Sequence, residues 1–375
     1  MIPSAVPSAI HRLLNFSAGP AVLPEEVLLE ARESLLSLGS CGIGILEISH
    51  RSKEFEAILA EAEANLRTLL GVPKDMVVLF LQGGASLQFS MVPMNLLCPG
   101  DTADYIVTGE WGRRAVVEAQ RIEHTHVHIA ASTETERFCR VPTDDELRLS
   151  PQPAYVHYTS NNTIFGTQYH RVPSVGSRPL VVDMSSDFLS RPVDIQRFGL
   201  VYAGAQKNAG PAGVTVVLLR PELLRLQPQQ ADRLPILLNY RTHIEHKSLY
   251  HTPPVFSIYI THLVLRWLLR NGGLSAMAQH NQQKADLIYQ AIDAAPGFYR
   301  GHARPDSRSQ MNITFRLPTP ALEDEFAKQA KAQGMDGLKG HRSVGGMRAS
   351  VYNAFPLTGA QTLAQFMADF ARKHG

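Results

Sequence analysis

The chain has 375 residues, of which 44% are hydrophobic and 19% are charged, and its formal net charge is +2. This composition is typical of a globular protein, and the length allows one large domain or two ordinary ones. The small net charge and the lack of a basic tract give no reason to expect a nucleic-acid partner.

The cysteines and the N-terminus predict a cytoplasmic protein. Cys41, Cys98 and Cys139 form no C-x-x-C pair, and an odd number of cysteines argues against a disulfide framework. Residues 1–7 have no basic leader and include two prolines, so we expect no signal peptide. No apolar stretch approaches the length of a membrane span, so we also expect no membrane partner.

From about residue 77, short β-rich segments alternate with helical patterns. Several of these segments are apolar almost throughout, as expected of strands that are covered on both faces. The order predicts an α/β fold with a mainly parallel sheet flanked by helices, in which ligands gather at the carboxyl ends of the strands. The predicted strands are residues 77–81, 105–108, 155–159, 180–183, 200–203 and 214–219.

The pattern changes after a long apolar helix predicted at residues 257–269. We therefore place a large domain at residues 16–268 and a smaller α+β domain at residues 269–375. The N-terminal segment 1–15 is expected to pack near the small domain or to be flexible. The elements predicted for the small domain are an amphipathic helix at 274–294, an alternating strand at 311–317 and helices at 321–333 and 358–372.

The most informative residue is Lys207, which follows the predicted strand 200–203 in the glycine-rich stretch GAQKNAGPAG. An amine delivered there has room around it and little freedom to move. Asp183 ends the strand before it in the chain. An acid and a lysine at the ends of two buried strands indicate an enzyme that uses pyridoxal 5'-phosphate (PLP), in which the lysine forms a Schiff base and the acid keeps the pyridine nitrogen protonated. A solvated loop lysine and a capping aspartate are the alternative.

Three further turns after predicted strands offer groups for the phosphate and the ring of this cofactor. Residues 82–86 (QGGAS) lead into a helical pattern, and glycines at a helix N-terminus expose N–H groups to an anion, to which Ser86 adds a hydroxyl. Trp111 could stack on a pyridine ring, or it could be an ordinary core or interface aromatic. Thr163 could donate a hydrogen bond to the cofactor, although an ordinary turn has a similar sequence.

Arginines and histidines near both ends of the chain indicate a substrate with two anionic groups. His50 and Arg51 follow an apolar segment near the N-terminus, and His341, Arg342 and Arg348 lie among glycines near the C-terminus. Arginine binds carboxylate and phosphate groups bidentately. For each arginine taken singly, a surface ion pair is the alternative.

Three other patterns have simpler interpretations. His124, His126 and His128 could lie on one face of a strand, but a zinc site would need a fourth ligand, and we expect no metal. Residues 144–146 (DDE) are interpreted as a helix start, where negative charge is favoured. Trp267, within the long apolar helix, is assigned to the core.

Taken together, these segments resemble the phosphoserine aminotransferases, a family of PLP-dependent enzymes of fold type I. The resemblance implies that L-glutamate gives its amino group to 3-phosphohydroxypyruvate, forming O-phospho-L-serine and 2-oxoglutarate in serine biosynthesis. It leaves open an activity on the related phosphorylated intermediate of pyridoxine synthesis. The matching stretches are residues 15–20, 48–55, 202–213, 251–254, 339–342 and 345–354.

The resemblance also implies a role for each candidate residue. Lys207 would hold the cofactor and later move a proton, Asp183 would pair with the pyridine nitrogen, and Trp111 would stack on the ring. Arg348 would bind the α-carboxylate of the substrate. Thr252, with its neighbour His251, would reach the cofactor phosphate from a partner subunit, which implies a homodimer with shared sites. The phosphate end and the ring substituents are assigned to Ala85, Ser86, Thr163 and Gln206, and the distal anionic group of the substrate to His50, Arg51, His341 and Arg342.

Two positions depart from the family pattern. Many members have an arginine where this chain has Ser86, and that arginine helps to bind substrate anions. The family often has asparagine where this chain has His251, which can still donate to phosphate with some pH sensitivity.

Three other functions are compatible with parts of the sequence. An aminotransferase of the same fold that acts on glyoxylate or pyruvate would not need Arg51, His341 and Arg342. A PLP-binding protein without catalysis would not need an intact pair of Asp183 and Lys207. A plain phosphate-binding module would leave Lys207 unexplained.

Overall fold

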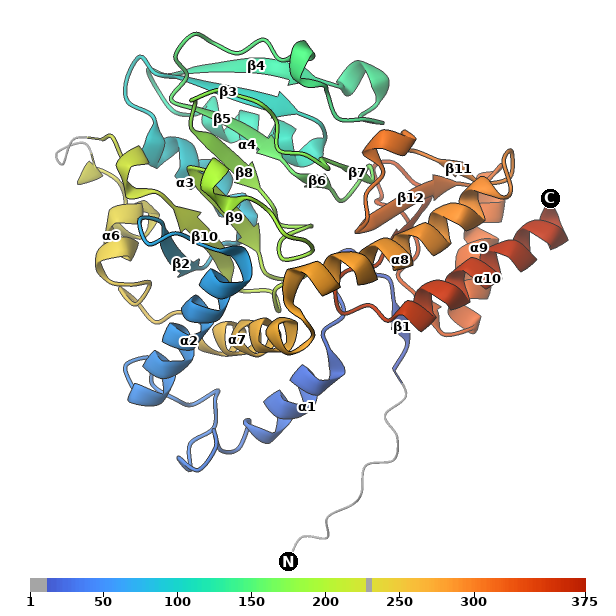
Figure 1. Ribbon diagram of the computed structural model, residues 1–375, viewed down its shortest axis with the longest axis horizontal. Helices are drawn as coiled ribbons and strands as arrows, with labels where there is room; N and C mark the ends of the chain where they lie inside the picture. Colours follow the sequence, from blue (N-terminus) through green and yellow to red (C-terminus); the bar gives the residue numbers. More distant parts are fainter. Residues whose placement is uncertain (1–11, 227–230) are drawn as a thin grey trace, which may run out of the picture.

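The computed structural model describes residues 12–226 and 231–375 (Figure 1). Most of the predicted N-terminal segment, residues 1–11, lies outside the described residues. The described chain contains a central seven-stranded sheet in the order β2-β10-β9-β8-β5-β3-β4. Its strands are β2 (Val77–Leu81), β3 (Thr102–Val107), β4 (His126–Ser132), β5 (Tyr155–Thr159), β8 (Leu180–Asp183), β9 (Leu200–Gly204) and β10 (Thr215–Leu219).

The direction of the strands confirms the prediction of a mainly parallel sheet. From β9 to β4 every neighbouring pair is parallel, whereas β10 is antiparallel to both β2 and β9. Because β2 and β9 are both antiparallel to β10, they run in the same direction. The turns that follow β2, β3, β5, β8 and β9 therefore lie at one edge of the sheet.

Both faces of the sheet are covered by helices, which explains why the strands are apolar almost throughout. Along β9, Leu200 and Tyr202 face one hydrophobic cluster, and Val201 and Ala203 face the other. The helices α2 (Lys53–Leu70) and α7 (Val255–Arg270) contribute to the second of these clusters, whereas α3 (Gly84–Leu96) and α4 (Glu110–Ala119) contribute to the first. The shorter helix α1 (Glu25–Glu33) adds Val27 and Ala31 to the cluster that contains α2 and α7, and α6 (Tyr240–Glu245) adds Tyr240 to the other cluster.

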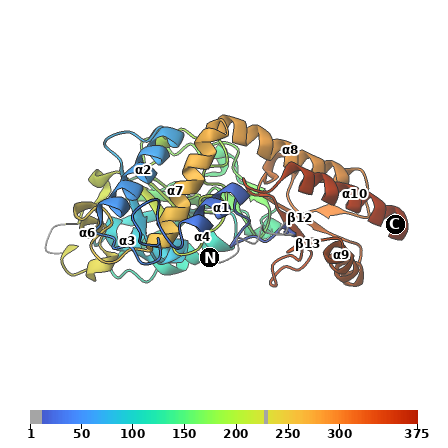
Figure 2. The same cartoon turned by 90° about the horizontal axis from the view of Figure 1, so that it is seen from below.

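The C-terminal elements have a hydrophobic cluster of their own. A three-stranded sheet of β11 (Arg300–Gly301), β12 (Asn312–Arg316) and β14 (Met347–Ser350) packs with α8 (Gly273–Asp293), α9 (Pro320–Ala332) and α10 (Leu357–His374). Figure 2 shows these helices beside β12 on one side of the molecule. Near the N-terminus, β1 (Leu14–Asn15) pairs with β13 (Met335–Asp336), and Phe16 joins the same cluster.

Helix α8 belongs to both parts of the molecule. Leu274 and Met277 in its first turns pack in the larger core, and Ala285 and Ile288 pack in the C-terminal cluster. The proposed division of the chain between residues 268 and 269 stays a prediction.

Two local differences between the predicted and the observed elements involve hydrogen bonds of polar groups within apolar segments. β3 begins three residues before its predicted start because buried Asp104 interrupts the apolar pattern, and this carboxylate accepts hydrogen bonds from the backbone N–H and the hydroxyl of Ser150 (2.7 and 2.6 Å). Trp267 is partly buried and packs at the edge of the larger core, to which it was assigned. Its indole N–H needs an acceptor and donates to Glu26 at 3.0 Å.

The acidic and histidine patterns also have defined places. Residues 144–146 form a single 3₁₀ turn, and Thr143 and Glu146 cap it reciprocally. His124 precedes β4 in the left-handed backbone region (φ 60°), so that only His126 and His128 lie in the strand. No group of three potential metal ligands occurs in residues 12–226 and 231–375. None of the helices in these residues has the length and hydropathy that a membrane crossing requires.

Candidate active site

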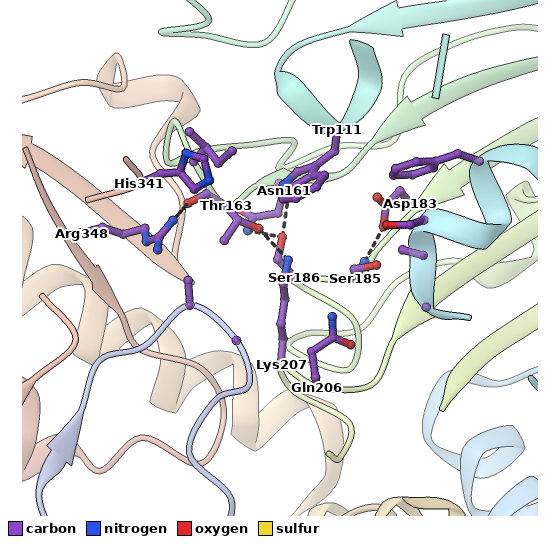
Figure 3. A pocket seen from close by; sticks show the side chains of 17 residues that line it. Trp111, Asn161, Thr163, Asp183, Ser185, Ser186, Gln206, Lys207, His341 and Arg348 are labelled. Atoms are coloured by element: carbon purple, nitrogen blue, oxygen red, sulfur yellow. Dashed lines mark hydrogen bonds between the residues drawn. The ribbon is translucent and has the colours of Figure 1, made fainter. Parts of the chain in front are cut away.

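A cavity of about 310 Å³ lies at the carboxyl edge of the central sheet (Figure 3). Lys207, Asp183, Trp111 and Thr163 reach it from positions at or just beyond the carboxyl ends of four strands, and Arg348 reaches it from β14 in the C-terminal sheet. The cavity therefore lies where the two parts of the molecule meet. Its other lining residues are Ala18, Gly19, Gly84, Ala85, Ser86, Phe89, Asn161, Ile164, Ser185, Ser186, Gln206 and His341.

Lys207 is half-buried in a tight turn that follows β9. The backbone N–H groups of Ala209 and Gly210 both donate to the Ala205 carbonyl, at 3.1 and 2.8 Å, and close the turn. The Nζ of Lys207 donates to Thr163 Oγ1 at 2.7 Å. Burial lowers the pKa of Lys207 to about 8. An amine with this pKa is partly neutral near pH 7 to 8 and can attack a carbonyl carbon.

Asp183 ends β8 with its side chain almost fully buried (3% exposed). Its Oδ1 accepts a hydrogen bond from the backbone N–H of Ser185 at 2.9 Å. Burial raises the pKa of this carboxyl, whereas the bonds from Ser185 and the charge of Lys207 lower it. Figure 3 shows Asp183 and Arg348 on opposite sides of Lys207. The cavity thus has an acidic end and a basic end with an amine between them.

The basic end consists of Arg348 and His341. An Nη of Arg348 donates to the Thr163 carbonyl at 3.4 Å, and its buried Nε has no hydrogen-bond partner among the described residues. Burial lowers the pKa of Arg348. Burial also lowers the pKa of His341, and the neighbouring guanidinium groups of Arg348 and Arg342 act in the same direction. This end of the cavity suits a carboxylate or a phosphate.

The turn after β2 has the geometry that would suit an anion. Gly83 has left-handed backbone (φ 89°), and a Cβ at this position would come within 2.3 Å of the Leu87 side chain. Ala85 and Ser86 lie in the first turn of α3, whose leading N–H groups have no acceptor within the helix. Trp111 lies in the first turn of α4, with Lys207 Nζ 6.0 Å from the centre of its ring.

These residues fit PLP. The start of α3 suits the phosphate, Asp183 suits a protonated pyridine nitrogen, and the flat face of Trp111 suits the ring. The buried Nε1 of Trp111 has no acceptor in the described part of the chain, and so can still donate to a bound group.

Nine of the predicted site residues line this cavity, and five do not. His50 and Arg51 lie just before α2, and the Nε2 of His251 contacts the Gln82 side chain, in the turn after β2, at 2.8 Å. The roles of all five stay predictions. The residues that lie outside the cavity of the described chain are His50, Arg51, His251, Thr252 and Arg342.

Sequence reasoning missed several lining residues that had a detectable signal. Ser185 and Ser186 directly follow Asp183 at the end of β8, so the position of the strand was sufficient to find them. Phe89 lies one helical turn after Ser86 on α3. Asn161 lies in the same turn as Thr163, within β6 (Asn161–Asn162), which pairs with β7 (Thr167–Gln168).

Comparisons with known proteins agree with this geometry. Residues 13–363 match the model of the class-V aminotransferase family. A phosphoserine aminotransferase of Herpetosiphon aurantiacus is 55% identical over 361 residues, which cover 96% of this chain and 99% of the relative. One of Halalkalibacterium halodurans is 52% identical over 365 residues, which cover 97% of this chain and all of the relative.

Solved structures are similar over the same length. The phosphoserine aminotransferase from Bacillus circulans subsp. alkalophilus has a TM-score of 0.93 and 51% identity, and the match covers 97% of this chain and 99% of that one. The PLP-bound phosphoserine aminotransferase from Trichomonas vaginalis has a TM-score of 0.89 and 37% identity, with 95% and 99% coverage. The architecture is that of the fold-type-I PLP-dependent transferases, as the sequence predicted. The chain therefore belongs to the phosphoserine aminotransferases of the class-V aminotransferase family.

Proposed function

We propose that this chain is a PLP-dependent aminotransferase that transfers the amino group of L-glutamate to 3-phosphohydroxypyruvate. The products are O-phospho-L-serine and 2-oxoglutarate. The observation that carries the proposal is the half-buried amine of Lys207, with a pKa of about 8, in a cavity between the carboxyl of Asp183 and the guanidinium of Arg348.

The cofactor supplies, when it is bound, an aldehyde carbon that accepts an amino group and a protonated ring that withdraws electrons from the α-carbon of the substrate. Asp183 would keep the ring nitrogen protonated, and the start of α3, near Ala85 and Ser86, would hold the phosphate. Gln206, which lies beside Lys207 in the cavity lining, would contact the ring substituents.

Lys207 performs the proton transfer. As a free amine, its side chain would take the proton from the α-carbon of the substrate and would hold that proton for its return to the carbon that receives the amino group. Thr163 supports this role because its Oγ1 already accepts from Lys207 Nζ at 2.7 Å. Arg348 binds the α-carboxylate and so fixes the α-carbon within reach of that amine.

The distal end of the substrate carries a carboxylate in glutamate and a phosphate in phosphoserine. Both must bind in one pocket. His341 at the basic end of the cavity can hold either anion, and we assign Arg342, which follows it outside the cavity lining, to the same group. A shorter apolar amino acid such as alanine has no group for this end and is expected to react poorly.

We further propose a cytoplasmic homodimer in which a second subunit completes each site. Large apolar side chains just before His50 support a covered surface there, because Leu36, Ile43 and Leu46 are 88%, 48% and 66% exposed in the single chain. The residues assigned to the second subunit are His50, Arg51, His251 and Thr252.

The decisive experiment follows the visible absorbance of the purified protein during half-reactions. We expect the band of bound PLP to be converted to that of pyridoxamine phosphate by O-phosphoserine and by glutamate, but not by alanine. Conversion by alanine alone would contradict the proposed substrates. The absence of a band even after PLP is added would contradict the proposed cofactor site. The same assay, with the phosphorylated hydroxy-threonine of pyridoxine synthesis as the amino donor, tests whether the protein also acts on that compound.

Lys207→Ala tests the mechanism in particular. This variant is expected to lose turnover completely while its oligomeric state and thermal unfolding stay close to those of the wild type. Activity like that of the wild type would show that Lys207 is not needed for the reaction.

A further inference from the structure

Asn208 follows Lys207 in the chain, yet its side chain points away from the cavity and into the protein, where it is 5% exposed. Its Oδ1 accepts a hydrogen bond from the backbone N–H of Asn353 at 3.0 Å. Its Nδ2 donates to the Ser186 carbonyl at 3.4 Å and contacts Met311 Sδ at 3.6 Å. Three segments that are distant in the sequence therefore meet at one amide group.

The segment that donates to Asn208 is itself held in place. The side chain of Asn353 donates to the Leu189 carbonyl at 2.9 Å and accepts from Asn281 Nδ2 at 2.8 Å. Lys284 Nζ donates to the Tyr352 carbonyl at 2.6 Å. Asn281 and Lys284 both belong to α8 and are fully buried. A shift of residues 352–353 would leave several buried polar groups unpaired, which is costly.

Arg348 lies on the same segment, five residues before Asn353. The hydrogen bond between the Asn353 N–H and Asn208 thus joins the two functional sides of the cavity, which are the turn that carries Lys207 and the strand that carries Arg348. A substrate bound by its carboxylate at Arg348 presents its α-carbon to Lys207 only if the distance between these two side chains is fixed.

We propose that Asn208 is a positioning residue that sets the place of the Lys207 amine relative to Arg348. The inference rests on the proposed transamination, because it presupposes that Lys207 transfers the proton. Asn208 does not line the cavity, so its effect passes through Lys207.

The test compares Asn208→Ala with Asn95→Ala in the holoenzyme. Asn95 is a matched control because it is as well buried (2% exposed) and its side chain also bridges backbone segments, through the carbonyls of Met91 and Leu238 and the N–H of Tyr240. Both variants are expected to unfold at a lower temperature than the wild type. Asn208→Ala alone is expected to slow the single-turnover reaction with glutamate by about 10- to 100-fold. Its KM should stay within about threefold, because Arg348 is unchanged.

A second readout does not depend on turnover. The apoprotein is mixed with PLP, the adduct on Lys207 is reduced with borohydride, and the modified peptide is quantified by mass. Trapping should be at least about fivefold slower in Asn208→Ala than in the wild type and unchanged in Asn95→Ala. Asn208→Asp keeps the acceptor oxygen for the Asn353 N–H and should recover most of both losses.

The outcomes separate the inference from the function on which it rests. Normal rates in Asn208→Ala, an equal loss in Asn95→Ala, or an Asn208→Asp protein as slow as Asn208→Ala would each overturn the positioning role. Asn208→Ser, whose hydroxyl is too short to reach the Asn353 N–H, takes the place of the alanine variant if that protein does not fold. Failure of the wild type to react with glutamate would contradict the proposed function itself.

Discussion

At Lys207, burial and a neighbouring carboxylate act on the pKa in opposite directions. Burial lowers it, the charge of Asp183 raises it, and the charge of Arg348 lowers it further. The net result is an amine with a pKa of about 8 instead of the ordinary 10.5. The carboxylate of Asp183 thus limits how far burial and the charge of Arg348 can lower the pKa of Lys207.

This balance predicts how the apoprotein captures PLP as the pH changes. Only the neutral amine attacks an aldehyde, so the initial rate should rise with pH, with a midpoint near 8, and level off at higher pH. Asp183→Asn removes the charge that raises the Lys207 pKa, so the midpoint should move to lower pH. Absorbance measurements between about pH 6 and 10 give both midpoints. A wild-type midpoint near 10.5 would contradict the effect of burial.

The turn that carries Lys207 depends on its contact with α7. A Cβ placed on Gly210 would lie 2.4 Å from Thr261 Oγ1 and 3.3 Å from Thr261 Cα, so the turn and the helix approach each other as closely as a glycine allows. Thr261 is fully buried, and its hydroxyl has no hydrogen-bond partner in the described ranges. The position of the turn is therefore set by steric contact on this side and by the Asn208 amide on the other.

Gly210→Ala is expected to lower the free energy of unfolding by about 1–3 kcal/mol, because the added methyl group overpacks this contact. Thr261→Ala removes the nearest atom, so the double variant should recover part of the loss. Gly301→Ala is the matched control, since its nearest neighbour would be 3.8 Å away, and it should change stability by less than about 0.5 kcal/mol. Equal losses in the two single glycine variants, measured by denaturant unfolding, would refute the contact.

For the molecule as a whole, the two parts meet through buried polar side chains around the cavity. Asn161 in β6 donates to Asn312 in β12 and to Ser186, each at 2.8 Å, and Asn312 donates to Tyr352 at 3.0 Å. Buried hydrogen bonds require defined partners, so this interface fixes one relative placement of the parts more specifically than apolar contact does.

The proposed dimer can be tested by mixing two inactive variants. Lys207→Ala lacks the amine, and Arg51→Ala lacks the guanidinium that we assign to the partner's site. Each mixed dimer would contain one complete site, so a randomly mixed sample should show about a quarter of wild-type activity. Sedimentation confirms the dimer in each sample. No recovery after subunit exchange would mean that Arg51 acts within its own chain, and an active Arg51→Ala homodimer would mean that Arg51 is not needed.

Local patterns were sufficient to predict six of the seven strands of the central sheet and much of the cavity lining. They did not predict β4, because it is an edge strand with a single buried side chain. Lys207, Asp183 and Ser86 follow apolar strands, and parallel strands bring such positions to one edge without further information. Contacts between distant segments could not be predicted in this way. Nothing near Asn281 or Lys284 indicates that these side chains would bond to residues 352–353, because such pairings depend on how α8 crosses between the two cores.

Polar residues inside apolar elements account for the remaining differences. Asp104 interrupts the apolar pattern at the start of β3, so the beginning of that strand was not predicted. The indole N–H of Trp267 donates to a side chain outside its own helix, so Trp267 is only partly buried. In both cases the hydrogen-bond partner lies in a different segment of the chain, which periodicity cannot reveal.

The pairing of β1 with β13 has a consequence for synthesis on the ribosome. Leu14 pairs with Met335 and Asn15 with Asp336, so the first described strand is translated long before its partner exists. Until then Phe16, which is fully buried in the finished protein, has no cluster to enter. Chaperones that bind apolar segments of nascent chains therefore have a long interval in which to hold this one, and closure of the C-terminal core is expected among the last steps of folding.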